Sequence, residues 1–231
     1  MRKEIVISLY DYTGEALKPW AEQGYQCYAF DIQHPKEGRV HEGICYQYAD
    51  LHDFNTHREI FNEFNGKRVI FGMAFPVCTD LAVSGAAHFK RKAERDPAFQ
   101  NKAAKHAVDC AHLFEDLGCP YFIENPVSVL ATKWRKPDYS FHPYEYGEYI
   151  PDDEAEHPRW PDHIAPKDAY PKKTCLWTGN NFTMPWTDPV EPEDGHSRQH
   201  LKLGGKSMKT KNIRSATPRG FAQAVYEFNS L

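Results

Sequence analysis

The chain has 231 residues, enough to bury the core of one domain, and its 41% hydrophobic and 26% charged residues indicate a folded globular protein. A net charge of −4 excludes a strongly basic protein, so any nucleic-acid contact has to come from a local basic surface. Six cysteines without a CxxC pair, and an opening that runs directly into an apolar segment, favour a reduced cytoplasmic protein without a secretory signal. No apolar run approaches the roughly 20 residues that cross a bilayer, so no membrane partner is expected.

Short apolar runs alternate with helical patterns over the first two thirds of the chain. This alternation predicts βαβ units and an α/β fold, with a mostly parallel sheet and helices on both faces. Strands are expected at 4–9, 25–30, 43–48, 67–74 and 120–124. Helices are expected at 14–23, 53–64 and 98–117, the last of them ended by Gly118.

The amino-acid composition of the chain changes at residue 131. Closely spaced prolines break any long helix there, and tryptophan and tyrosine alternate with acids, which predicts a small irregular insertion. The last residues carry an apolar stripe of helical spacing, with Thr217 as the expected N-cap and Pro218 in the first turn. We therefore divide the chain into a binding and catalytic core (1–130), an insertion (131–200), and a basic loop and helix that complete the core (201–231).

Cys78 is the first candidate catalytic residue. It follows Pro76 just beyond the expected strand 67–74, at the edge where open α/β sheets present reactive groups. A thiolate there is a candidate nucleophile. The alternative is a structural cysteine, because free cysteines are commonly small core residues. The preceding proline and the polar pair Thr79-Asp80 favour the nucleophile.

Glu124 and Asn125 end the next expected strand. The strand is apolar up to Glu124, so this carboxyl is expected at the rim of a desolvated pocket, where a raised pKa lets it share a proton with a ring nitrogen. Asn125 is expected to fix the loop. The alternative is a turn in which Asn-Pro only sets the backbone geometry.

The first strand and its turn suggest a nucleotide-like ligand. Asp11, Thr13 and Gly14 lie in the turn, and Asp31 ends the second strand 17 residues after Gly14, about where an acid holds ribose hydroxyls. One glycine makes a poor pyrophosphate cradle, so S-adenosylmethionine, an adenosine without phosphates, fits better than NAD. Asp50 closes the third strand and is a candidate for the adenine amine. The alternatives are helix caps and an exposed strand-end acid.

Two tracts resemble the catalytic motifs of the S-adenosylmethionine-dependent DNA (cytosine-5) methyltransferases. FPVCTDLAVSG looks like the Pro-Cys loop of that family with Val77 inserted, and IENP looks like its Glu-Asn-Val element with Pro126 in place of Val. Two further tracts, YPKKTCLWTGN (170–180) and RSATPRGFAQAV (214–225), are similar to tracts of short phage-borne members. The resemblance spans nearly the whole chain and implies a Rossmann-like methyltransferase fold.

The resemblance also implies roles for individual residues. Cys78 would attack C6 of a flipped-out cytosine, Glu124 would protonate N3 and hold the exocyclic amine, and C5 would take the methyl group. The residues implied in S-adenosylmethionine binding are Asp11, Tyr12, Thr13, Gly14, Asp31, Ile32, Asp50, Leu51 and Pro76.

The chain departs from the family in its recognition segment. Lys172-Lys173-Thr174 stands where an Arg-rich strand is expected, and about thirty residues separate it from Gly204, which indicates low sequence specificity or a substrate other than duplex DNA. The expected nucleic-acid contacts are Ser84, Lys172, Lys173, Arg198, Lys206, Lys209, Lys211 and Arg214. The alternative for most of these cations is a solvated surface. The histidines of the insertion match no strong zinc pattern, so no metal is expected.

The sequence therefore predicts an enzyme that methylates C5 of cytosine in DNA, with no obligate protein partner. Two alternatives stay open. The same chemistry could act on a free pyrimidine nucleotide or on RNA, or the chain could be a catalytically silent nucleic-acid-binding relative.

Overall fold

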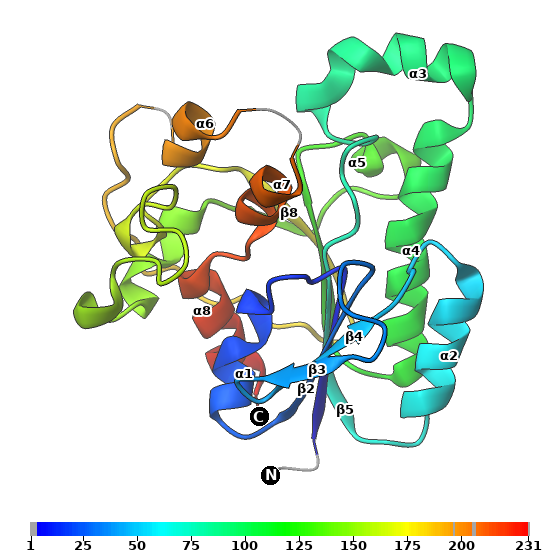
Figure 1. Cartoon of the computed structure of the whole chain (residues 1–231), viewed down its shortest axis with the longest axis horizontal. Helices are drawn as coiled ribbons and strands as arrows, with labels where there is room; N and C mark the ends of the chain where they lie inside the picture. Colours follow the sequence, from blue (N-terminus) through cyan, green and yellow to red (C-terminus); the bar gives the residue numbers. More distant parts are fainter. Residues whose placement is uncertain (1–3, 196, 205–206, 231) are drawn as a thin grey trace.

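The computed structural model describes residues 4–195, 197–204 and 207–230. Within them, eight strands form one sheet in the order β3-β4-β2-β1-β5-β6-β8-β7 (Figure 1). The strands are β1 (Ile5–Leu9), β2 (Gln26–Asp31), β3 (Arg39–His41), β4 (Ile44–Tyr48), β5 (Val69–Ala74), β6 (Tyr121–Pro126), β7 (Tyr139–Phe141) and β8 (Thr174–Gly179).

The centre of the sheet is parallel. β4, β2, β1, β5 and β6 run in the same direction, and all five residues of β1 are buried. A parallel sheet buries both faces under helices, which explains why these strands are continuous apolar runs in the sequence. The predicted α/β class, Rossmann-like with a mostly parallel sheet, is confirmed, and the five expected strands begin and end within two residues of their predicted bounds.

Helices cover the two faces of the sheet (Figure 1). On one face α2 (Phe54–Phe64) and α4 (Phe99–Leu117) pack on the core that contains Ile7 of β1. On the other face η1 (Glu15–Leu17), α1 (Lys18–Glu22) and α8 (Arg219–Asn229) pack on the core that contains Val6. Alternate residues of β1 thus pack into the cores on opposite faces of the sheet. Gly118 ends α4 in the left-handed region, as predicted.

The segment 131–200 is more regular than expected. β7 and β8 extend the sheet beyond β6, and β8 is antiparallel to both of its neighbours. The expectation of a wholly irregular insertion is therefore wrong for 139–141 and 174–179. The rest of the segment contains α5 (Leu130–Lys133), η3 (Pro143–Tyr149), η4 (Asp152–Glu154), η5 (Pro166–Asp168) and the start of α6 (Arg198–Lys202).

Three further helices lie near the ends of the strands: η2 (Val83–His88) and α3 (Phe89–Arg95) between β5 and α4, and α7 (Met208–Ser215) before α8. The predicted N-cap at Thr217 is wrong. α8 begins at Arg219 after Pro218, and no side chain caps it, because the proline occupies the position that a capping residue would take. No helix among the described residues has the length and apolar character needed to cross a membrane.

Candidate active site

The loops after β5 and β6 bring the two predicted catalytic residues to one edge of the sheet. The strands are parallel neighbours, with Ala74 opposite Ile123, so their carboxyl ends lie side by side. The loops are also joined directly, because the amide of Val129 donates to the carbonyl of Leu81 at 3.0 Å. Cys78 lies in the first of these loops, and Glu124 lies one residue beyond Ile123.

Cys78 is half-buried. Burial raises the pKa of its thiol, and the negative charge of Glu124 raises it further, whereas the cation of Lys172 opposes both effects. Each of these charges acts on the sulfur, so the structure places Cys78, Glu124 and Lys172 in one electrostatic neighbourhood. Lys172 therefore places a cation near this thiol, which the sequence could not identify.

Glu124 presents a desolvated carboxyl. Its Oε1 is buried and has no hydrogen-bond partner among the described residues. Burial raises the pKa of Glu124, and Lys172 counteracts only part of that effect. A carboxyl in this setting takes up a proton more readily than an exposed one, and its Oε1 is available to a ligand.

A small pocket lies over Glu124. The Lys172 ammonium lines it and is tethered by a 2.8 Å hydrogen bond to the carbonyl of Arg214. The pocket is lined by Phe75, Glu124, Phe141, Lys172, Thr174, Ser215, Ala216, Thr217, Pro218 and Phe221. The tracts 170–180 and 214–225, which stood out in the sequence, therefore meet at this pocket. Lys172, predicted as a nucleic-acid contact, thus lines a pocket together with the buried carboxyl of Glu124.

Asn125 links the two loops. Its side chain is 1% exposed, and Nδ2 donates to the carbonyl of Pro76 at 3.0 Å. Pro76 precedes Cys78 by two residues, so this bond sets where the Cys78 loop leaves the strand. Asn125 Oδ1 is buried without a partner.

The turn after β1 is held by Asp11. The carboxylate is 3% exposed and accepts hydrogen bonds from the Gly14 amide at 2.7 Å, the Ser8 hydroxyl at 2.8 Å and the Thr13 hydroxyl at 3.2 Å. Burial raises its pKa, and these hydrogen bonds oppose that shift. Because the turn itself uses its oxygens, Asp11 shapes this part of the predicted cofactor site. Gly14 has φ 71, and a Cβ there would overlap the Tyr46 hydroxyl.

Two predicted ligand carboxylates lie at neighbouring strand ends. Asp31 ends β2, which pairs with β4, and its Oδ1 accepts from the Gln33 amide at 2.8 Å. Ile32 beside it is 55% exposed. Asp50 follows β4 and accepts from the His52 amide at 3.1 Å. In each carboxylate, Oδ1 accepts this hydrogen bond within its own turn, and Oδ2 does not take part in it.

Two other residues predicted to bind the cofactor contribute differently. Leu51 is buried, and its carbonyl accepts from the Tyr10 hydroxyl at 2.9 Å, so it supports the strand end from within the core. Tyr12 is half-buried and stacks on the His34 ring, with the centroids 5.8 Å apart.

The strand-end residues fit an adenosine-containing ligand without phosphates. Asp31 and Asp50 offer acceptors for hydroxyl and amino groups, and exposed Ile32 offers an apolar face for a purine. The turn at Gly14 contains a single glycine instead of a glycine-rich phosphate cradle. S-adenosylmethionine meets these conditions.

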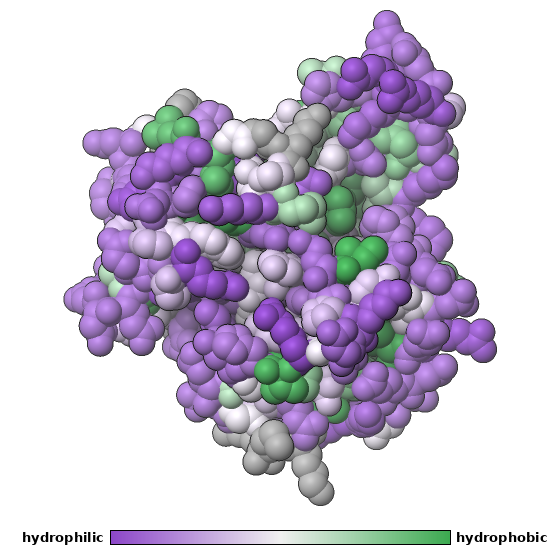
Figure 2. All heavy atoms as spheres, viewed as in Figure 1, coloured by the Kyte–Doolittle hydropathy of each residue, from purple (hydrophilic) through white to green (hydrophobic). Residues whose placement is uncertain are grey.

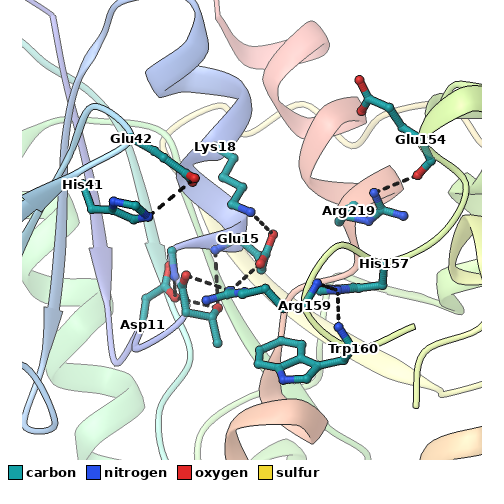
Figure 3. Close-up of polar contacts among 12 residues, drawn as sticks. Asp11, Glu15, Lys18, His41, Glu42, Glu154, His157, Arg159, Trp160 and Arg219 are labelled. Atoms are coloured by element: carbon teal, nitrogen blue, oxygen red, sulfur yellow. Dashed lines mark hydrogen bonds and ion pairs between the residues drawn. The ribbon is translucent and has the colours of Figure 1, made fainter. Parts of the chain in front are cut away.

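An arginine from the insertion contacts the same turn, and the sequence did not reveal it (Figure 3). Arg159 Nη2 donates to the Thr13 carbonyl at 3.0 Å and forms an ion pair with Glu15. The Glu15 side chain is fully buried, and its other oxygen lies 3.1 Å from Lys18 Nζ. Glu15 and Arg159 are 144 residues apart, so no local pattern could have linked them.

The predicted nucleic-acid contacts divide into exposed side chains and side chains that bind other parts of the protein. Ser84, Lys173, Lys209 and Lys211 are exposed. Arg198 instead forms an ion pair with Glu193 at 2.6 Å and donates to the Pro161 carbonyl at 2.9 Å, which indicates a structural role. Arg214 donates to the Leu203 carbonyl. Lys206 lies outside the described residues.

Helix α3 carries a second basic surface that the sequence analysis overlooked. Lys90, Arg91 and Arg95 are exposed, and α3 stands apart from α6 and α7 across the end of the sheet (Figure 1). In the space-filling view the outline of the molecule dips between these two parts (Figure 2). Cations thus stand on both sides of the edge that carries Cys78.

Comparison with known proteins gives a structural similarity. No family model matches the chain, and no curated protein matches it. Among solved structures, the chain is similar to a candidate DNA modification methyltransferase encoded within a prophage of E. coli, with 13% identity and a TM-score of 0.46. The match covers 81% of this chain and 52% of that one, so the chain spans about half of the length of that protein. A similarity of this size does not define an activity.

Proposed function

We propose that this chain is an S-adenosylmethionine-dependent DNA (cytosine-5) methyltransferase. The observation that carries the proposal is the grouping of Cys78, Glu124 and Lys172 at the ends of two neighbouring parallel strands. A half-buried thiol, a desolvated carboxyl and a cation are the groups needed to add a nucleophile to a pyrimidine ring and to stabilise the adduct.

The chemistry assigned to the residues balances as follows. The Cys78 thiolate forms a bond to C6 of cytosine while neutral Glu124 gives its proton to N3, so the ring gains no net charge and C5 becomes enamine-like. After C5 has been alkylated, loss of the C5 proton to a base returns an electron pair to the ring. The C6–S bond then breaks, and the N3 proton returns to Glu124. Lys172 stabilises the thiolate before addition and again as it leaves.

The methyl group comes from S-adenosylmethionine, whose sulfonium makes the methyl carbon electrophilic. Asp31 and Asp50 would bind the ribose hydroxyls and the adenine amine, and Ile32 would cover the purine face. Pro76, which Asn125 fixes, would separate this ligand from the cytosine. A base inside a duplex is out of reach of such a pocket, so the target cytosine has to be flipped out of the stack.

DNA is the proposed substrate because cations flank the catalytic edge on two sides. Lys209 and Lys211 on α7 and the exposed cations of α3 can each neutralise phosphates, although the net charge of the chain is −4. A free nucleotide would need only one such group. We therefore expect DNA affinity to fall steeply with salt, and to lose part of that dependence when Lys209 and Lys211 are both replaced by glutamine.

A trapping experiment tests the covalent step. With S-adenosylmethionine present, duplex DNA containing 5-fluorocytosine should form an adduct with the protein that survives denaturation, because after methyl transfer the fluorine at C5 blocks elimination. Cys78→Ser should form none, whereas Cys45→Ser, which changes the other half-buried thiol, should behave as the unaltered protein. An adduct in Cys78→Ser would refute the nucleophile.

A substrate comparison tests the proposal further. Mass spectrometry of nucleosides should find 5-methylcytosine in treated DNA. Faster turnover of dCMP or RNA than of DNA would refute the substrate while leaving the chemistry intact. No methylation of any pyrimidine, with Cys78→Ser indistinguishable from the unaltered protein, would indicate a silent binding protein.

A further inference from the structure

Arg159 reaches from the insertion onto the turn after β1, where it has unused donors (Figure 3). Its Nη2 donates to the Thr13 carbonyl and to Glu15, while no hydrogen bond or ion pair within the described part of the chain involves Nε or Nη1. The side chain is 39% exposed. A guanidinium has five N–H donors in a fixed plane, so the three on Nε and Nη1 remain for a ligand.

The charges around Arg159 leave a surplus positive charge at this turn. Two cations, Arg159 and Lys18, share the single carboxylate of Glu15. His157, the nearest imidazole of the insertion, adds no charge, because burial lowers its pKa to about 4. Asp11, the other carboxyl of the turn, is buried, and burial raises its pKa, so the positive charge of Arg159 stays available to an anionic ligand group.

The order of the strands identifies where that anionic group would come from. Asp50, Asp31 and the Thr13 turn follow β4, β2 and β1, which are consecutive neighbours in the sheet. An extended ligand with its adenine at Asp50 and its ribose at Asp31 therefore places its far end over the turn after β1. In S-adenosylmethionine the far end is an amino acid, and its anionic group is a carboxylate.

We propose that Arg159 binds the carboxylate of the amino-acid end of S-adenosylmethionine, so that the insertion completes the cofactor site. This inference rests on the proposed function for the identity of the ligand. Glu15 and Thr13 hold the guanidinium on one side, and the Trp160 ring lies 4.6 Å from it, so the side chain is ordered before the ligand arrives. A preordered arginine loses little conformational entropy on binding and can form two parallel hydrogen bonds to a carboxylate.

The test compares two ligands that differ in the amino-acid end. Isothermal titration calorimetry would measure the Kd of S-adenosylhomocysteine, which has the carboxylate, and of 5′-methylthioadenosine, which lacks the whole amino-acid end. Arg159→Gln should weaken S-adenosylhomocysteine by about 10- to 100-fold, as expected for a charge-assisted hydrogen bond, and methylthioadenosine by less than about threefold. Arg159→Lys keeps the charge without the fork and should give an intermediate loss.

Arg135→Gln is the matched control, because Arg135 also pairs with a carboxylate, Asp138, and donates to a carbonyl, that of Thr178. It should bind both ligands as the unaltered protein does. If Arg159→Gln and Arg159→Lys weaken both ligands equally, or neither ligand, Arg159 only fastens the insertion to the turn, and the inference is overturned. If the unaltered protein binds neither ligand, the proposed function fails first, which the same titration distinguishes.

Discussion

Replacing Asn125 tests whether the two catalytic loops depend on one side chain. Asn125→Ala removes the 3.0 Å hydrogen bond to Pro76 and leaves that carbonyl buried without a partner. An unsatisfied buried acceptor costs about 1–3 kcal/mol. The alanine also removes the unpartnered Oδ1 of Asn125, which offsets part of this cost, so we expect a loss of about 1–2 kcal/mol in the free energy of unfolding.

For a chain of this length, such a loss lowers the Tm by about 2–8 °C. Asn125→Asp should be worse at neutral pH, because a buried carboxylate would face the Pro76 carbonyl with no proton to donate. Burial raises the folded-state pKa of such a carboxyl above the unfolded value of about 3.9. The acid form, which can donate to Pro76, is therefore favoured at low pH, and its stabilisation is lost as the pH rises through the folded pKa.

Thermal and urea unfolding from pH 5 to pH 8 would measure both effects. Two results would refute the reasoning: an alanine variant that melts within 1 °C of the unaltered protein, or an aspartate variant whose stability relative to alanine does not fall between pH 5 and pH 8.

Two further predictions concern single groups of the site. Lys172→Met removes the cation that favours the thiolate, so the pKa of Cys78 should rise and its alkylation by iodoacetamide at pH 8 should slow, whereas Glu124→Gln should lower that pKa and speed alkylation. Mass spectrometry of the Cys78 peptide across pH measures both rates. A change of the same sign in the two variants would contradict the charge arrangement. Gly14→Ala forces a side chain into the left-handed region, at about 1–2 kcal/mol, and against the Tyr46 hydroxyl. Urea unfolding should show this loss of stability, and part of it should be recovered in the Tyr46→Phe background. A Gly14→Ala variant as stable as the unaltered protein would refute the close approach of Tyr46 to this turn.

The central strands could be predicted from the sequence because a strand that is buried on both faces consists of a continuous apolar run. The sequence did not show the outer strands. β3 is three exposed residues at the edge of the sheet, and β8 is a short run next to the Pro171 break, so neither has a pattern that exceeds that of a loop. Only the pairing with β4 and with β6 makes these segments strands.

The candidate site shows the same limit. Cys78 and Glu124 could be paired from sequence, because both follow parallel strands and parallel strands end at one edge. The ion pair of Arg159 and Glu15 could not, since it depends on the path of the insertion through space. Likewise, Arg198 and Lys211 look alike in a basic stretch, and only the contacts of Arg198 with Glu193 and the Pro161 carbonyl distinguish it as structural.

The position of β8 between β6 and β7 bears on how this chain could be re-engineered. β8 pairs with all six residues of β6, from Tyr121 opposite Gly179 to Pro126 opposite Thr174. Replacing the whole segment 131–200 with another segment would remove β8 and leave the edge of β6 unpaired, where it could aggregate. The segment 131–200 therefore cannot be exchanged as a whole, and a graft would have to keep 174–179 and exchange only the loops on either side.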